Sequence, residues 1–400
     1  MHTTCRTVFR LKVFVYRPLQ LLGLLPISFD SKSKRFFQSQ WNLLLSIVQT
    51  IIVSSMLPVA YYILVTMVYN ETSGLSNLMV ILELIIGYFL LVSFCVKMLL
   101  RGSNVTEILN IFGGIFFNVC VESDCIDENL LRTYLRKVIL VDYILFPITF
   151  GMYIPFSIGW KLSHLISWLL NSYSIFLMLM IINLFQSTII SSSIIYLKLN
   201  NRVTSAVQTL RKLNENQITI SGSYLPKVKT YRNLSLEINK LCYLHRMTTE
   251  AVQRMIGILS MPLLIITFFQ FFVVLTEAYY NYIYLMNNMF IPSFIYGQIL
   301  SSTLFMLMCL LQFYYTVSFS AQMTQRAEAT AILLNESFYN DAGRCVEQSI
   351  EMFTLEMLHR DYRVRIYDCF ALDFTLAHSV SIGISNITVG LIPLFPRNHL

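Results

Sequence analysis

Three hydroxyl-bearing residues near the end of the chain have the spacing of one helix face. Ser381, Ser385 and Thr388 are separated by four and three residues within an apolar stretch, so a helix would place them in one line. Such a line can face water, and symmetry-related copies of it would form a narrow polar conduit. Small residues also let helix backbones approach closely in lipid, so helix packing is the alternative interpretation.

A second group of residues has the chemistry of a ligand pocket. Glu277 is followed by four tyrosines within seven residues. A single charge in lipid costs at least about 2.5 to 3.5 kcal/mol, so Glu277 and the similarly placed Glu83 are expected to face a cavity or a partner. Apolar walls with few polar groups select small organic molecules. The predicted pocket residues are Glu83, Glu277, Tyr279, Tyr280 and Tyr284, and the alternative is an aromatic belt at the outer membrane interface.

Motifs for enzymatic chemistry are absent from the sequence. It contains no glycine-rich phosphate loop, no HExxH motif, no nucleophile elbow and no pair of intramembrane aspartates. Cys120 and Cys125 lie close together, but no second Cys or His pair at ligand spacing accompanies them. The sequence therefore predicts neither an enzyme nor a bound metal or cofactor.

The composition indicates which elements position these side chains. Hydrophobic residues make up 56% of the 400 residues, and the mean hydropathy is +0.61. This is more apolar surface than a soluble core of that size can bury. Seven stretches reach the roughly 20 residues that a helix needs to cross a bilayer, and they lack the alternation of barrel strands. The predicted fold is an all-α seven-helix transmembrane bundle, with crossings near 42–68, 75–99, 138–160, 165–197, 256–286, 291–319 and 373–395.

The positive charges predict the orientation of this bundle. Of the 29 Lys and Arg residues, 26 fall in four stretches that alternate with apolar segments, namely 1–40, 101–137, 198–255 and 320–372. Short cytoplasmic loops retain positive charge, so the N-terminus is expected inside and the C-terminus outside. Anionic lipid accounts for these charges, so no nucleic-acid partner is predicted. Asn70, in the sequon Asn70-Glu71-Thr72 of an outer connection, is the predicted glycosylation site.

The predicted domains are a cytoplasmic segment, 1–40, and a transmembrane domain, 41–400, with cytoplasmic helical extensions in the other three basic stretches. Val8, Leu11, Val15, Leu19 and Leu22 have helical spacing, which favours an interfacial segment on the inner leaflet. Two apolar stripes follow in the extensions: Tyr231, Leu234, Ile238, Leu241 and His245, and then Val346, Ile350, Phe353 and Met357. They suggest either a platform between subunits or packing within one chain.

Residues 369–376 (Cys-Phe-Ala-Leu-Asp-Phe-Thr-Leu), the apolar crossing after them and residues 391–395 (Leu-Ile-Pro-Leu-Phe) resemble the last helix of insect gustatory receptors. Residues 21–31 and Trp41 resemble one fly branch of that family. The resemblance implies a homo- or heterotetrameric, ligand-gated, non-selective cation channel in the plasma membrane of gustatory neurons, across dendrite, axon and cell body. It also implies a tastant pocket in the outer half of the bundle, with bitter compounds the commonest ligands, and a central pore formed by the last helix.

The chain departs from the family pattern Thr-Tyr, five apolar residues, Gln-Phe at the end of that helix. With Phe395 aligned to the final Phe, Ile387 and Thr388 occupy the Thr-Tyr positions, Pro393 falls in the apolar run, and the pore-lining Gln is replaced by Leu394. These changes remove a polar side chain and a backbone donor from the outer end of the pore. The first alternative is therefore a non-conducting or modulatory subunit of a heteromer. Two further classes are less favoured: a receptor of the G-protein-coupled type needs the opposite charge bias, and a transporter needs inverted repeats or several convergent ionisable groups.

Overall fold

The computed structural model describes residues 15–30, 33, 35–67, 74–120, 128–153, 162–215, 224–287, 293–335 and 344–391. Nearly all of them are helical. The elements, in chain order, are α2 (Arg17–Leu21), β1 (Ile27–Asp30), β2 (Arg35–Gln38), α3 (Gln40–Met67), α4 (Gly74–Cys120), α5 (Glu128–Lys137), the π-helix η2 (Val138–Leu145), α6 (Phe146–Tyr153), α7 (Leu162–Glu215), α8 (Tyr224–Asn287), α9 (Ser293–Asn335), α10 (Arg344–Leu358), β3 (Arg365–Ile366), β4 (Phe370–Ala371) and α11 (Phe374–Leu391).

The predicted crossings coincide with helices. In the described part of the chain, five helices are long and apolar enough to cross a membrane, at Gln40–Ile63, Ile81–Phe116, Leu165–Leu213, Val228–Tyr279 and Ile299–Asn335. The other two predicted crossings, 138–160 and 373–395, fall on η2 with α6 and on α11. A helical membrane fold is therefore confirmed, whereas the count of seven crossings and their orientation stay predictions.

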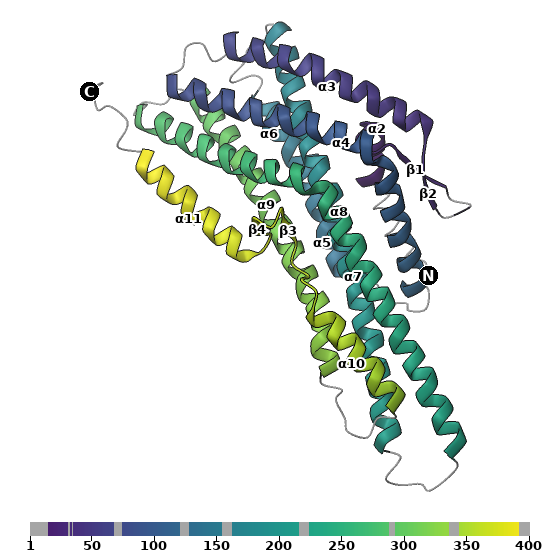
Figure 1. Ribbon diagram of the computed structural model, residues 1–400. Coiled ribbons are helices and arrows are strands. Elements are labelled where there is room, and N and C mark those ends of the chain that lie inside the picture. The colour runs from purple at the N-terminus through teal and green to yellow at the C-terminus, as the bar shows by residue number, and fades with distance from the viewer. Residues whose placement is uncertain are drawn as a thin grey trace.

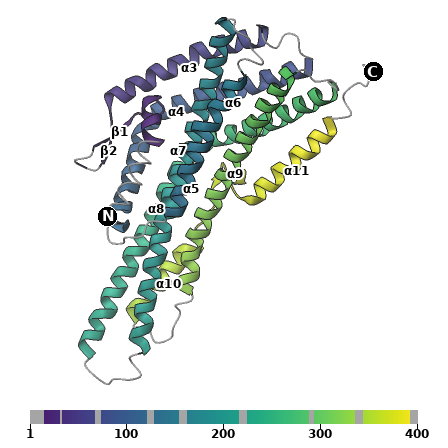
Figure 2. The same cartoon turned by 180° about the vertical axis from the view of Figure 1, so that it is seen from behind.

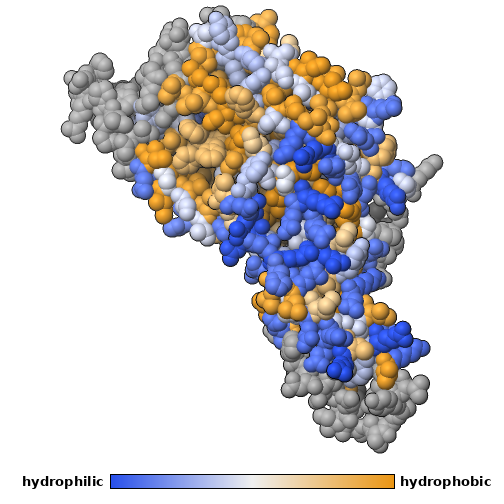
Figure 3. All heavy atoms as spheres, viewed as in Figure 1, coloured by the Kyte–Doolittle hydropathy of each residue, from blue (hydrophilic) through white to orange (hydrophobic). Residues whose placement is uncertain are grey.

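Several of these helices are much longer than a bilayer is thick. The 64 residues of α8 span about 96 Å. The segment from Lys227 to Arg254 contains eight charged residues, both ends included, and the segment from Met255 to Thr276 contains none. Only the second half of α8 therefore suits the hydrocarbon layer. Below it, α7, α8 and α9 continue side by side as a stalk with α10 packed against them (Figures 1 and 2). The wide upper body is mainly apolar on its surface, and the stalk is more hydrophilic (Figure 3).

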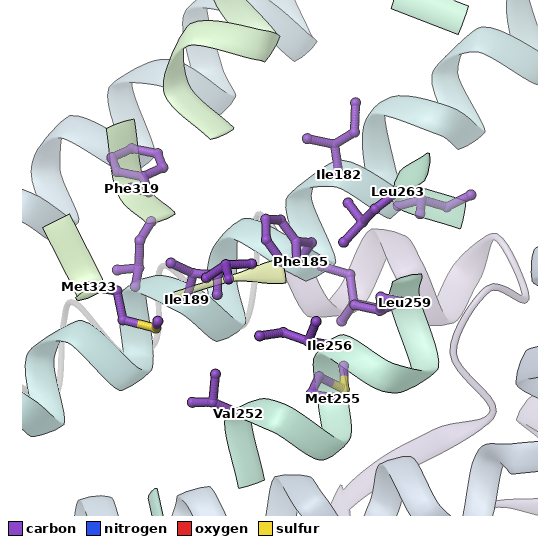
Figure 4. Packing of buried hydrophobic residues seen from close by; sticks show 14 of the residues in the cluster. Ile182, Phe185, Ile189, Val252, Met255, Ile256, Leu259, Leu263, Phe319 and Met323 are labelled. Atoms are coloured by element: carbon purple, nitrogen blue, oxygen red, sulfur yellow. The ribbon is translucent and has the colours of Figure 1, made fainter. Parts of the chain in front are cut away.

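The central helix of the bundle is α7, which contacts α3, α4, α8 and α9. Its side chains are buried over most of its length because neighbours surround it. Figure 4 shows one section of this core, in which α7 packs against α8 and α9. The labelled buried residues are Ile182, Phe185 and Ile189 of α7, Val252, Met255, Ile256, Leu259 and Leu263 of α8, and Phe319 and Met323 of α9. Each contributes on the order of 1.5 to 3 kcal/mol when fully removed from water.

The N-terminal segment docks on the bundle through a β-hairpin. β1 and β2 pair in antiparallel register, and Asn110 of α4 binds the Phe36 backbone twice: the Phe36 N–H donates to Oδ1 (2.7 Å), and Nδ2 donates to the Phe36 carbonyl (2.9 Å). Val15 and Leu19 are fully buried in the protein core. The predicted interfacial placement was thus wrong for these two residues, because the hairpin returns the segment to the bundle. Val8 and Leu11 lie outside the described residues.

Candidate functional site

The structure brings both predicted acids of the pocket together with a residue of a third helix. Glu277 of α8 accepts a hydrogen bond from the Ser302 hydroxyl of α9. The carboxylate of Glu83, on α4, lies within electrostatic range of Glu277, and Cys309 of α9 lies within electrostatic range of both. Ser302 was missed by the sequence analysis, because no spacing links a serine on one helix to a glutamate on another.

Aromatic and small residues surround this acidic pair. Tyr61 of α3 interacts electrostatically with Glu83, and its hydroxyl lies 3.2 Å from the Ser174 hydroxyl of α7. At Gly87, one turn of α4 after Glu83, an added Cβ would lie 2.8 Å from Cε of Met178. The end of the Met178 side chain from α7 thus occupies the space beside Gly87. The site can supply hydrogen-bond acceptors and hydroxyls within an apolar environment, which suits a small organic ligand.

The tyrosines of the predicted pocket are described only in part. Tyr279 lies on α8 and is buried. Tyr280 and Tyr284 also lie on α8, but their side chains fall outside the description. Asn70 lies outside the described residues. Whether these residues contact a ligand stays a prediction.

The predicted pore residues lie on α11, which packs against α8 and α9 by one face (Figure 1). Gly383 is on that face, since an added Cβ would lie 3.8 Å from the Phe271 ring. Ser381 and Ser385 are exposed and donate to the helix backbone at Ala377 and Ser381. The Thr388 side chain and Leu394 lie outside the description. The serine stripe is therefore open to water, to lipid or to a second subunit.

Asp373 is the N-terminal cap of α11. Its Oδ1 accepts hydrogen bonds from the backbone N–H groups of Thr375 (3.0 Å) and Leu376 (3.1 Å). A carboxylate in this position satisfies unpaired N–H groups and interacts favourably with the helix dipole. The charge at the start of this crossing is thus explained by helix capping.

A buried ion pair joins the third predicted crossing to α7 and α9. Lys137 Nζ lies 3.3 Å from Asp142 Oδ2 and donates to Asn183 Oδ1 of α7 at 2.7 Å, with both charged side chains 0% exposed. Asn183 Nδ2 donates to Asp142 Oδ2 (2.8 Å), and Gln312 of α9 donates to Asp142 Oδ1. The Tyr134 hydroxyl donates to the Asn183 carbonyl (2.9 Å). These five residues form what we call the Lys137 network.

The two apolar stripes of the extensions pack inside one chain. Ile238 of α8 and Ile350 and Phe353 of α10 line the same small apolar cavity, together with residues of α7 and α9. The alternative of packing within one chain is therefore the correct one for these stripes.

The same packing encloses His245 in the stalk. Its ring centroid lies 4.9 Å from that of Tyr196, 5.8 Å from Phe353 and 5.4 Å from Tyr362. Burial, aided by the positive charge of Arg360, lowers the pKa of His245 to about 3. The imidazole is consequently neutral in the folded stalk at physiological pH.

Acid should destabilise the stalk through His245. An unfolded histidine binds a proton below about pH 6.5, whereas the folded one resists protonation down to about pH 3. Stability from this residue is thus complete above about pH 6.5, and falls by a few kcal/mol as the pH decreases toward 3. We expect the thermal unfolding midpoint of the purified protein to decrease from pH 7.5 to 5, and to decrease less in His245→Leu. Equal slopes for both proteins would contradict this assignment.

Comparisons with known proteins place the chain in a family. The family model described as 7tm Chemosensory receptor matches residues 14–392. The insect olfactory receptor OR5 from Machilis hrabei has a similar structure, with a TM-score of 0.64, 11% identity, and coverage of 98% of this chain and 99% of that chain. Its complex with eugenol gives a TM-score of 0.58, 11% identity, and coverage of 97% and 98%.

At 11% sequence identity, the similarity to these receptor structures shows only that the fold is shared. No curated protein sequence matches the chain. The family is one of membrane receptors and not of enzymes, in agreement with the absence of catalytic motifs. Because the family model covers nearly all residues, this multi-pass membrane protein belongs to the 7tm chemosensory receptor family.

Proposed function

We propose that the chain is a subunit of a tetrameric, ligand-gated cation channel of the gustatory type, which opens when a small organic tastant binds in the outer half of the bundle. The observation that carries this proposal is the convergence of Glu83, Glu277 and Ser302, from three helices, inside an apolar bundle. The eugenol complex of the olfactory receptor with the same fold supports a small organic ligand.

The chemistry of the acidic pair narrows the ligand class. Two neighbouring carboxyl groups favour a ligand that donates hydrogen bonds or carries positive charge, because such a group relieves their mutual repulsion. Aromatic residues such as Tyr61 and Phe269 add apolar contact area nearby. We therefore propose amphipathic compounds with a basic nitrogen or a hydroxyl group, which includes many bitter substances.

The pore is proposed to form where four copies of α11 meet. Ser381 and Ser385 are exposed on the face turned away from α8 and α9, as a pore stripe requires. The cytoplasmic N-terminus, the plasma-membrane location in gustatory neurons and glycosylation at Asn70 belong to the same proposal. A modulatory subunit of a heteromer is the second candidate, favoured by Pro393 and Leu394, where the sequence departs from the family motif.

Pocket and pore substitutions should have different effects on ligand-evoked current. Expression in cultured cells, with calcium imaging against a tastant panel, first identifies an agonist. Glu277→Gln and Ser302→Ala should then raise the half-activating concentration about tenfold or more, because each removes a charge-assisted hydrogen bond, while single-channel conductance stays unchanged. Current that appears only with a second subunit present would support the modulatory role.

Cysteines in the stripe should instead affect the ion path. In Ser381→Cys and Ser385→Cys, a small thiol reagent added from outside should reduce the current. Ser379→Cys is the matched control, because Ser379 is exposed on the same helix but on another face. Altered conductance in Glu277→Gln, together with inert stripe cysteines, would reverse the assignment of pocket and pore.

A further inference from the structure

Three basic residues gather where α4 and α8 leave the apolar body of the protein. Lys97 Nζ of α4 donates to the Gly257 carbonyl of α8 at 3.4 Å. Arg101 follows one turn later, at a position of non-helical backbone (φ −116°, ψ 16°), and its charge repels that of Lys97. Arg254 precedes Gly257 by one turn on α8. Lys97 and Arg101 thus lie one turn apart on α4, and Arg254 lies on the α8 turn that precedes the Lys97 contact.

These charges are poorly compensated by the protein. Within the described residues, their only ion pair joins Arg254 to Glu107 at 3.5 Å, and both partners are more than half exposed. Exposed pairs of this kind contribute at most about 1 kcal/mol. Among the described residues, the three basic side chains therefore share one carboxylate partner. This leaves an excess of positive charge that can bind an anionic ligand.

The level of the cluster matches a membrane boundary. On α4, no charged residue lies between Glu83 and Lys97, and on α8 none lies between Arg254 and Glu277. Under the orientation predicted from the positive charges, this boundary is the cytoplasmic one. Anionic phospholipids are concentrated in that leaflet.

The surface above the cluster is shaped for acyl chains. Along α4 the exposed apolar side chains on the membrane side include Ile85, Phe89 and Val96, and along α8 they include Met261 and Phe268. Leu100, between Lys97 and Arg101, is 79% exposed. A Cβ added to Gly257 would meet no atom within 4 Å, so the exposed side of α8 is open at the residue whose carbonyl Lys97 contacts. A free phosphate or a nucleotide would not use this apolar surface, whereas a phospholipid would use both parts.

We propose that Lys97 and Arg101 bind the phosphate headgroup of an anionic phospholipid of the cytoplasmic leaflet, that Arg254 adds positive charge on α8, and that the acyl chains lie along the α4–α8 contact. Each basic residue near a membrane surface strengthens binding of anionic lipid roughly fivefold. Because the site includes the irregular turn at Arg101, the bound lipid would brace the joint between the membrane half of α4 and its cytoplasmic extension.

The experiment titrates delipidated, full-length protein with phosphatidylserine or phosphatidylcholine and counts bound lipids by native mass spectrometry. We expect the wild-type protein to prefer phosphatidylserine. The double variant Lys97→Gln, Arg101→Gln should lose affinity for phosphatidylserine roughly 25-fold, with unchanged affinity for phosphatidylcholine. The matched control Lys229→Gln, Lys240→Gln removes two exposed charges from α8 more than about 20 Å along the helix, and should bind like the wild type.

A second variant keeps the three basic residues and tests the role of the open surface at Gly257. Gly257→Leu covers the open surface of α8 at this residue and replaces glycine by a better helix former, so it should fold and still lose phosphatidylserine. Equal phosphatidylserine binding by the wild type and both site variants would overturn the proposal. Equal losses in the site variants and in the stalk control would also overturn it, because they would show a general charge effect. Competition by inorganic phosphate at millimolar concentration, with acyl chains making no difference, would replace the lipid by a free anion and reject it as well.

Discussion

Replacing Lys137 by methionine should destabilise the protein by about 3–5 kcal/mol, whereas the double substitution Lys137→Met, Asp142→Leu should recover most of that loss. The single variant leaves the Asp142 carboxylate at 0% exposure without its counter-charge. A buried charge that loses its partner is far more costly than the pair or than its apolar replacement. In detergent, the expected decrease in the thermal unfolding midpoint is on the order of 10 °C for the single variant.

Two further variants calibrate this prediction. Tyr134→Phe removes one hydrogen bond to the Asn183 carbonyl and should cost only about 1 kcal/mol. Lys240→Met changes an exposed lysine in the stalk and should leave the midpoint nearly unchanged. If the double variant is as unstable as Lys137→Met, the two charges do not act as a pair, and Asn183 and Gln312 carry the network instead.

The Lys137 network also illustrates what sequence patterns can miss. Lys137 was counted only as the last basic residue of the stretch 101–137, and the sequence analysis did not identify Asp142. A spacing of five residues does not place two side chains together on an α-helix. The structure has a π-helix at 138–145, whose hydrogen bonds join residues five apart, and this brings the pair together.

The membrane helices could be predicted from the sequence, because the length of each apolar run and the charges beside it determine where a helix lies. An uncharged run such as 255–276 on α8 satisfies its backbone only as a helix in lipid, and the charged residues before it predict the extension into the stalk. The hydrogen bond between Glu277 and Ser302 could not be predicted from the sequence, since it depends on which helices become neighbours in the fold. The same limit applies to the stripe containing Phe353, for which the sequence offered two partners and the structure selects the same chain.

Because that stripe is internal, an interface between subunits in the stalk must use another surface. On α10 the opposite face carries Met352, Leu355 and Leu358, with Met352 69% exposed. Exposed apolar residues at successive turns are typical of protein interfaces. We name these three residues the outer face of α10 and propose that it contacts a neighbouring subunit in the proposed tetramer.

Charge on the outer face of α10 should therefore abolish assembly and leave the fold intact. Burial of each apolar side chain contributes roughly 1.5 to 3 kcal/mol, so Met352→Glu combined with Leu355→Glu should shift the proposed tetramer to smaller species after solubilisation and eliminate ligand-evoked current. The thermal unfolding midpoint of the separated subunit should stay near that of the wild type, because these side chains have no role in the core of their own chain.

The control for this experiment is Phe353→Glu, one residue away on the inner face. Phe353 is buried against α7 and α8 within its own chain, so this variant should misfold and be lost during purification rather than yield a soluble, folded subunit. Mass measurements in detergent distinguish the two outcomes. A folded tetramer that persists after both outer-face substitutions would exclude this face as the contact between subunits, and leave α11 and the membrane helices to hold the channel together.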